Sequence, residues 1–313
     1  VLSYEMAREY MPSPKATYAK VTVNGTLIGL YTCIQSIDDD FTNENFYERK
    51  GPFFKVDNTG ISVPGCSGPL GIFEYYSDTN CYQRAYEMES TADWTELGNF
   101  LDTLNNHFTE VENVMDIDRT LWMMAFENLI VGLDGPVNSI PHNFYLFKDN
   151  NGRFSPLLWD MNMAFGTFTN GLPSPVTNAN LQELDIFHNS NDASNKLTTQ
   201  IFSSDRYKRM YVAHMRTILN EQFVNNLYNG RALSLQLLIN SDVSSDPNTF
   251  YSYTEFMDNI STSVANIIGI SELMNARTSH LQGLSEFTAT PPAITSISTN
   301  PAAVLPHTSV SIT

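Results

Sequence analysis

Alternating apolar and polar positions predict two β-hairpins, one near the start of the chain and one near its centre. Each has Asn-Gly between two alternating segments, which is the strongest short-range signal for a hairpin. The turns are Asn24-Gly25 and Asn151-Gly152. The predicted strands cover residues 18–23, 27–34, 143–148 and 153–159. A further short apolar strand, Phe53 to Val56, follows a Gly-Pro break.

Apolar residues at three- and four-residue spacing predict helices between and after these strands. The helix before the second hairpin is predicted to start at the cap Asp118 and to end at Gly132. Other predicted helices cover residues 1–11, 38–49, 94–104, 196–227, 229–240 and 249–281. The polar residues 169–195 predict a long surface loop. Strands in the first half and helices in the last third favour an α+β fold.

The open end of the second hairpin is predicted to bring polar side chains together. If Asn151-Gly152 is a two-residue turn, Asn143 lies opposite Asp160, and their Cβ atoms are about 5 Å apart. Asp134 enters the same end from the preceding loop. Oxygen ligands in this arrangement suit Mg²⁺, which takes one or two carboxylates and keeps positions for waters and phosphates. Spacing alone equally allows a polar hairpin end with capping residues.

The order of these motifs resembles the CotH family of spore-coat protein kinases. The matching pieces are Gly29-Leu30-Tyr31, Phe41, Phe53-Phe54-Lys55, Asp134, His142-Asn143 and Trp159-Asp160. No single piece is specific, but their order and spacing together are. The family is similar to protein kinases in fold and uses ATP and a divalent metal, Mg²⁺ or Mn²⁺, to phosphorylate proteins on Ser. The resemblance therefore implies a two-lobed fold over residues 1–288, with a small β-rich N-lobe and a helical C-lobe.

The resemblance also implies a role for individual residues. Asp134 matches the catalytic-loop acid and Asp160 the metal-binding acid. Lys55 matches the strand lysine that pairs with nucleotide phosphates. Its apolar flank predicts a half-buried cation that needs a partner, and we prefer Glu87 over Glu89 for this ion pair.

The His-Asn motif before the second hairpin is expected at the cofactor. Asn143 would offer its amide oxygen to the metal, and His142 favours a structural hydrogen bond over acid–base chemistry. Asn162 stands where the family often has a second acid, in W-D-x-D, and can ligate a metal only as a neutral oxygen. Gln35 stands where the family usually has Glu.

These two departures leave a second hypothesis open beside the kinase. In this hypothesis the catalysis of the kinase fold is weakened or lost. The chain then serves as a binding or adhesion module with carbohydrate or cell-surface partners. A metal hydrolase ranks third, because such sites usually recruit His as well. The acids Asp38 to Asp40 fit a helix start better than a Ca²⁺ site.

Charge and hydropathy narrow the set of partners. The 313 residues carry a net charge of −17 with only 17 basic residues and no basic run, which argues against nucleic-acid and anionic-membrane binding. No apolar run approaches the 18 residues of a membrane span. An acidic surface fits a secreted or cell-surface protein. Cys66 and Cys81 are the plausible disulfide pair, and Cys33, in an apolar strand, is predicted to be a buried thiol.

The two ends of the sequence suggest a piece of a longer protein. The chain opens within a helical pattern and has no signal peptide, so an upstream export signal and part of the N-terminal domain are expected. From Pro291 the sequence has no charge and alternates like β-structure. Residues 289–313 therefore predict a linker and the start of an immunoglobulin-like module, common in secreted bacterial proteins.

Overall fold

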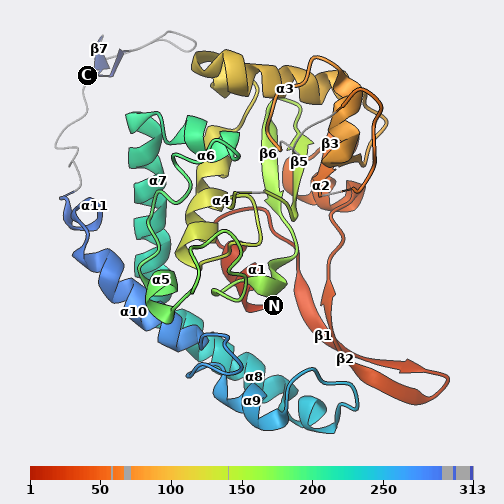
Figure 1. Ribbon diagram of the computed structural model, residues 1–313, viewed down its shortest axis with the longest axis vertical. Coiled ribbons are helices and arrows are strands. Elements are labelled where there is room, and N and C mark those ends of the chain that lie inside the picture. The colour runs from red at the N-terminus through yellow and green to blue at the C-terminus, as the bar shows by residue number, and fades with distance from the viewer. Residues whose placement is uncertain (58, 67–71, 140, 291–298, 301–310, 313) are drawn as a thin grey trace.

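The chain folds into a mixed α+β structure, with helices both beside its main sheet and on the side away from it (Figure 1). The computed structural model describes residues 1–57, 59–66, 72–139, 141–290, 299–300 and 311–312. The strands are β1 (Ala16–Val23), β2 (Thr26–Ile34), β3 (Phe53–Val56), β4 (Tyr86–Met88), β5 (Phe144–Lys148), β6 (Phe154–Leu158), β7 (Thr299–Asn300) and β8 (Ser311–Ile312). They form a β1–β2 hairpin, a four-stranded sheet in the order β4-β3-β5-β6, and a β7–β8 pair.

Helices make up most of the C-terminal half. The α-helices are α1 (Leu2–Ala7), α2 (Asp39–Phe46), α3 (Trp94–Asn106), α4 (Ile117–Leu129), α5 (Asn178–Gln182), α6 (Lys196–Ile201), α7 (Asp205–Ile218), α8 (Leu227–Ser245), α9 (Tyr253–Asp258), α10 (Ile270–Gly283) and α11 (Ser285–Thr288). Short 3₁₀ or π turns are η1 (Thr79–Arg84), η2 (Phe108–Asn113), η3 (Met161–Met163) and η4 (Leu219–Val224). Among the described residues, no helix combines the length and apolarity needed to cross a membrane.

The four-stranded sheet is buried on both faces. One face carries Phe54, Val56 and Leu146 into the large core shared with α3 and α4. The other face carries Phe53 and Tyr145 into a smaller core beneath α2. Because side chains alternate along a strand, Lys55 lies on this second face. The sheet thus holds Lys55 next to a packed aromatic layer.

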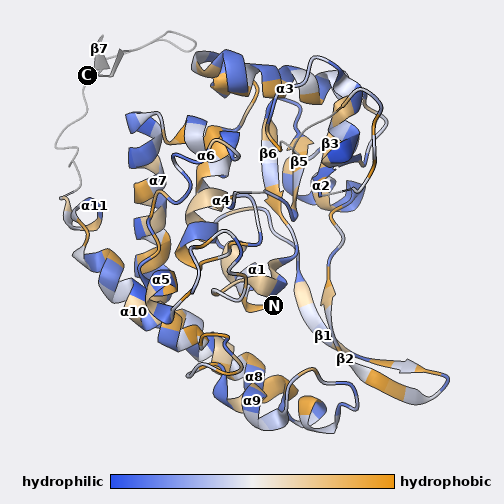
Figure 2. Cartoon of the chain, in the orientation of Figure 1, coloured by the Kyte–Doolittle hydropathy of each residue, from blue (hydrophilic) through white to orange (hydrophobic). Residues whose placement is uncertain are grey.

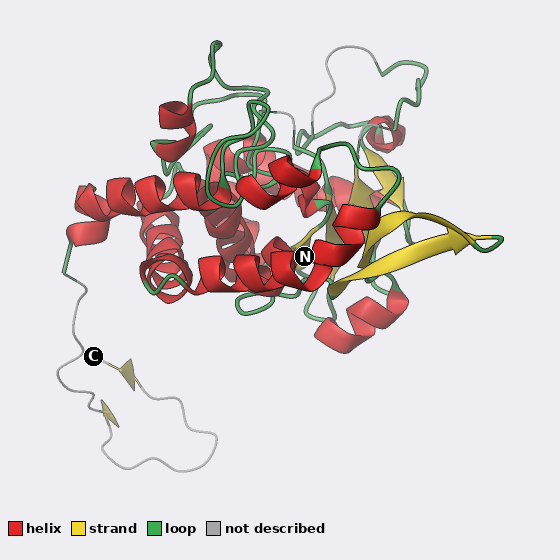
Figure 3. Ribbon diagram, turned by 90° about the horizontal axis from the view of Figure 1, so that it is seen from below, coloured by secondary structure: helices red, strands yellow, loops and turns green. Residues whose placement is uncertain are grey.

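Helices α7 and α10 bury one stripe and leave the opposite side mainly polar, whereas α4 is buried on nearly all sides and α8 exposes Leu233, Leu237 and Leu238. Figure 2 shows apolar and polar residues alternating around α7, α8 and α10. Seen from below, the helices gather on one side of the molecule, and the β1–β2 hairpin projects from the other (Figure 3). In α7 and α10, the apolar residues whose spacing predicts a helix are therefore the residues that face the large core.

The register of the second hairpin differs from the prediction. Asp149, not Asn150, pairs with Arg153, and Asn143 lies opposite Trp159, so its pairing with Asp160 was wrong. The Asp149 carboxylate accepts the backbone N–H groups of Asn151 and Arg153, at 2.9 and 3.1 Å. This side-chain bonding widens the turn to three residues, with Gly152 in the left-handed region at φ 81°.

Several other boundaries also needed correction. Asp116, not Asp118, caps α4. The predicted helix 249–281 is two helices, because Asn259 donates its amide to the carbonyls of Thr262 and Ile267 and closes a turn. Cys33 is exposed on the projecting hairpin, not buried. The first hairpin, with its Asn24-Gly25 turn, is confirmed.

Two further predictions have mixed outcomes. The predicted helix 196–227 is split into α6, α7 and η4. The Cys66–Cys81 disulfide is present. Residues 291–298, 301–310 and 313, on which most of the immunoglobulin-like prediction falls, lie outside the described residues.

A buried arginine joins α10 to the end of α4. Arg277 is fully buried, and its guanidinium donates to the carbonyls of Leu129 and Leu184 at 2.9 and 3.0 Å. It also donates to the backbone and side-chain oxygens of Asn128, at 3.0 and 2.8 Å. Burial lowers the pKa of Arg277 to about 10, so it stays charged at neutral pH. These bonds fix the helix end from which the Asp134 loop departs.

We expect Arg277→Met to lower the free energy of unfolding by about 3 kcal/mol or more, because it leaves several buried carbonyl oxygens without a donor. Urea denaturation followed by circular dichroism measures this change. Arg209→Met, on the exposed side of α7, is the matched control and should stay within about 0.5 kcal/mol of wild type. Equal stability of the two variants would contradict the role of Arg277.

Candidate functional site

The loop between α4 and β5, residues 132–143, carries Asp134 and is held by hydrogen bonds from residues far along the chain. Asn195 is fully buried and donates to the carbonyls of Pro136 and Asn138, at 2.9 and 2.7 Å. Asn189 donates to the carbonyl of Val137 at 2.9 Å. Irregular backbone needs such partners when it is buried. Residues 169–195, predicted as a surface loop, therefore support the loop that carries Asp134.

The carboxylate of Asp134 is fixed by the two residues that precede β5. His142 Nε2 lies 2.8 Å from Asp134 Oδ1. The Asn143 amide donates to Asp134 Oδ2 at 3.2 Å and to its carbonyl at 2.8 Å. A carboxylate has about four acceptor positions, so each Asp134 oxygen keeps one for a further donor. His142 has the hydrogen-bonding role expected of it, and Asn143 positions Asp134 through its nitrogen.

Asp160 lies two residues beyond the end of β6 and adopts a left-handed backbone conformation, with φ 51°. The segment after it returns to the end of α4, where the N–H groups of Phe165 and Gly166 donate to the carbonyls of Ile130 and Val131. Burial raises the pKa of Asp160, and the negative charges of Asp134 and Asp57 raise it further. The charges of His142 and Lys55 lower it. Two other carboxylates and two basic groups therefore act on Asp160 at this end of the sheet.

Lys55 reaches the same region from β3. Its side chain is 23% exposed, and Nζ lies 3.4 Å from Asp57 and 3.6 Å from Glu87. The expected ion pair with Glu87 is thus present, and the β3–β4 register explains it, because Lys55 and Glu87 are directly opposite each other. Asp57 was not predicted, although its period-two spacing from Lys55 puts both side chains on one face of the strand.

A small cavity lies between the two acids and contains a third. The cavity, of about 10 Å³, is lined by Glu127, Asp134 and Asp160 among others, and has room for one water molecule or one cation. Glu127 is only 2% exposed. Burial raises its pKa to about 8, with a further contribution from the charge of Asp134. Sequence analysis missed Glu127, since nothing in a helical pattern distinguishes it from a surface acid.

Asn162 and Gln35, the two departures from the family pattern, lie apart from this cavity. Asn162 is exposed on η3 and is not among the residues that line it. Gln35 accepts a hydrogen bond from the backbone of Lys15 and donates to Glu44 of α2. Its role is therefore to tie the β2 end to α2.

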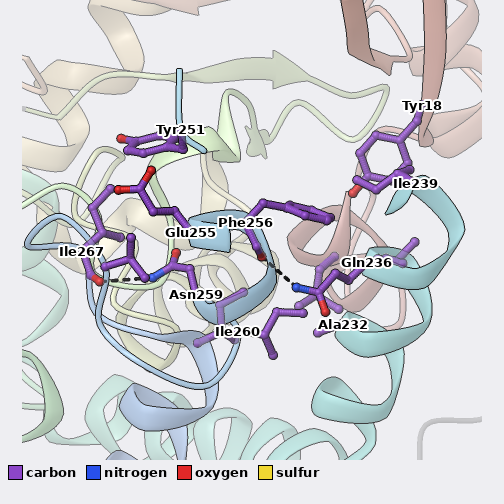
Figure 4. Close-up of a pocket in the computed structure, with 14 residues that line it drawn as sticks. Tyr18, Ala232, Gln236, Ile239, Tyr251, Glu255, Phe256, Asn259, Ile260 and Ile267 are labelled. Carbon is purple, nitrogen blue, oxygen red and sulfur yellow. Dashed lines mark hydrogen bonds between the residues drawn. The ribbon is translucent and has the colours of Figure 1, made fainter. Parts of the chain in front are cut away.

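A larger cavity, of about 300 Å³, lies between α1, β1, α8, α9 and α10 (Figure 4). It is lined mainly by apolar side chains such as Ile239, Phe256 and Ile260. Glu255 is the single charged residue in its lining. Phosphate groups need cations or clustered N–H donors, which this lining lacks. The small acidic cavity lined by Asp134 and Asp160, the second of which is affected by the charge of Lys55, is therefore the better candidate of the two for nucleotide chemistry.

The sequence model of the CotH kinase protein family matches residues 1–281. The chain belongs to the CotH kinase protein family. A search of curated proteins returned no match. Membership in the CotH family indicates a kinase-like function, and the matched region includes every residue of the site described above.

The raised pKa of Glu127 in this CotH protein makes stability depend on pH. Between its ordinary pKa of 4.5 and about 8, Glu127 is protonated in the folded protein and charged in the unfolded chain. Folding then takes up a proton, so stability falls as pH rises through this window, by at most about 1.4 kcal/mol per pH unit. Glu127→Gln cannot titrate. We expect its stability relative to wild type to increase from pH 5 to pH 8.

Urea denaturation at pH 5, 6, 7 and 8, with EDTA present to remove metals, measures this difference. The matched control is Glu110→Gln, which changes an exposed carboxyl in η2. The stability of the control should follow that of wild type at every pH. A Glu127→Gln profile parallel to wild type would show that Glu127 is already ionised in the folded protein at pH 5.

Proposed function

We propose that this chain is an ATP- and divalent-metal-dependent protein Ser kinase of the CotH type. The observation that carries the proposal is the convergence of Asp134 and Asp160 on one small cavity, with Lys55 within the electrostatic reach of Asp160. In this proposal the main sheet and the helices that follow it correspond to the two lobes of a kinase-like fold.

The proposed reaction uses the chain's own residues for positioning and for one proton transfer. The substrate Ser oxygen forms a bond to the γ-phosphorus of ATP as the bond between that phosphorus and the β–γ bridging oxygen breaks, and ADP leaves with the electron pair. Asp134 accepts the Ser hydroxyl proton. His142 and Asn143 hold its carboxylate in place through their bonds to both oxygens. Lys55 pairs with the phosphates.

The donor set around Asp160 fits a hard divalent cation. Carboxylate and amide oxygens suit Mg²⁺ or Mn²⁺, and the amide oxygen of Asn143 is not used in its bonds to Asp134. Asp160 would hold the metal, which would supply neutralisation of the phosphate charge. Asn143, expected from the sequence as a second ligand, does not line the cavity and bonds Asp134 through its nitrogen. The negative charges of Asp134 and Asp57 contribute to the raised pKa of Asp160. A bound cation would compensate for this accumulation of negative charge.

The proposed substrates are Ser-containing proteins outside the cytoplasm, either secreted or on the cell surface. A disulfide joins Cys66 and Cys81. Disulfides persist mainly in oxidising compartments, which supports this location. The acidic net charge of −17 disfavours nucleic acid as a partner.

The alternative is a weakened CotH-like binding module with carbohydrate or cell-surface partners. It is favoured by one feature, the apolar cavity of Figure 4, which could hold a ligand unrelated to phosphoryl transfer. Nucleotide binding separates the two functions, because a pure binding module needs no metal–ATP complex.

We expect Asp160→Ala to remove metal-dependent ATP binding, measured by calorimetry with Mg²⁺ or Mn²⁺, and with it autophosphorylation. Asp134→Ala should still bind ATP but lose transfer by about 10²-fold or more, because it loses the positioned base. Transfer is measured with γ-labelled ATP and phosphoserine analysis. Both variants should stay folded, since each acid lies outside the apolar core.

Asp258→Ala is the matched control, because this acid is exposed on α9, away from the residues of the site. It should bind ATP and transfer phosphate as wild type does. Wild-type protein that binds no nucleotide with any divalent metal would rule out the kinase and leave the binding module.

A further inference from the structure

A polar pocket of about 310 Å³ lies where the turn after α1 meets the end of β2 and helix α2. Gln35, which directly follows β2, and Glu44 and Asn45 of α2 form part of its wall. The pocket shares no lining residue with the cavity of Asp134 and Asp160. Small-molecule sites have volumes of about 300 Å³ and above, so this pocket is large enough for a ligand of its own.

Arg8, the first residue after α1, contributes a guanidinium group to the pocket lining. One of its N–H groups donates to the carbonyl of Pro14 at 2.9 Å and so holds the side chain across the turn. Among the described residues, no carboxylate forms an ion pair with Arg8. Glu5, three residues earlier, is bound through both oxygens by Arg231. The guanidinium therefore keeps N–H donors and a positive charge for a ligand.

Lys15 adds a second cation, and Glu44 is the single acid in the lining. Both Glu44 oxygens are already engaged, Oε1 by the Lys15 ammonium and Oε2 by the Gln35 amide at 3.2 Å. The Lys15–Glu44 pair is exposed and such pairs contribute little free energy, so the ammonium can turn toward a ligand. Because Gln35 is neutral, two cations face one carboxylate. The pocket lining is thus positive, within a chain of net charge −17.

Ser13 provides an independent observation in the same wall. It lines the pocket and is only 5% exposed, yet its hydroxyl has no hydrogen-bond partner among the described residues. Buried polar groups nearly always have a partner. Pro12 and Pro14 flank Ser13, and proline restricts both its own backbone and that of the residue before it, so the wall is stiff. Rotation of the hydroxyl lets it donate to an oxygen atom bound in the pocket.

We propose that this pocket binds a phosphate group, carried either by a phosphoserine side chain or by free inorganic phosphate. The planar fork of Arg8 matches two phosphate oxygens, and Lys15 supplies a second positive charge. The unused N–H of Gln35 and the hydroxyl of Ser13 bring the donors to four side chains, which suits the three terminal oxygens of a phosphate monoester. The site is independent of the proposed kinase activity.

Isothermal titration calorimetry tests this assignment with two probes, inorganic phosphate and N-acetyl-O-phosphoserine amide. The titrations use EDTA, no nucleotide and constant ionic strength at neutral pH. We expect at least one probe to bind with a Kd of about 1 mM or tighter, and acetate to bind at least about tenfold more weakly. Arg8→Gln removes a cation and Gln35→Glu adds a carboxylate, so each should weaken phosphate binding by at least about tenfold.

Two variants serve as controls and should bind phosphate as wild type does. Arg209→Gln makes the same change of charge as Arg8→Gln at an exposed position of α7 outside the pocket. Lys55→Ala alters the proposed nucleotide site. Thermal melting curves establish that every variant is folded at the temperature of the titration.

The two probes distinguish the sources of the phosphate. Tighter binding of the phosphoserine probe assigns the pocket to a phosphorylated protein, and equal or weaker binding assigns it to the free ion. The inference is overturned if neither probe binds, if acetate binds as tightly, or if Arg8→Gln retains wild-type affinity. Loss of phosphate binding in Lys55→Ala alone would overturn it too, while supporting the nucleotide site of the kinase proposal.

Discussion

Hydrogen bonds to the irregular backbone of residues 132–143 are the constraint on which the site depends. This loop is largely buried, so its carbonyl groups need donors that water cannot supply. Asn189 and Asn195 provide them, and Arg277 fixes the end of α4 from which the loop departs. With its backbone held by these bonds, the loop presents Asp134 to His142 and Asn143, just before β5, despite the negative charge of Asp160.

The sequence was informative about which residues matter and less so about how they are arranged. Asp134, Asp160 and Lys55 could be singled out, and the structure brings them to one end of one sheet. The pairing of Asn143 with Asp160 failed, because the turn was assigned from Asn151-Gly152 alone. The side chain of Asp149 bonds two backbone N–H groups and lengthens the turn by one residue. A one-residue change in register reverses the face of every side chain, so short-range signals were insufficient here.

Glu127 and Asn195 could not be predicted, for a different physical reason. Each is a polar residue within a segment where polar residues are common, a helix in one case and an Asn-rich loop in the other. Their importance comes from burial, which depends on contacts with residues distant in sequence. The two glycines near Glu127 gave no usable signal, because the closeness of Gly132 to its carboxyl group appears only in the folded structure. Local propensity alone could not identify the group that they accommodate.

A crystal structure with Mn²⁺ and a non-hydrolysable ATP analogue would test most directly whether Asp160 anchors a metal–nucleotide complex. Anomalous scattering locates the manganese independently of the surrounding density. We predict a manganese peak about 2.1 Å from a carboxylate oxygen of Asp160, with the phosphates directed toward Lys55. A nucleotide bound in the apolar cavity around Ile239, or a structure at saturating Mn²⁺ without a peak at Asp160, would contradict this account.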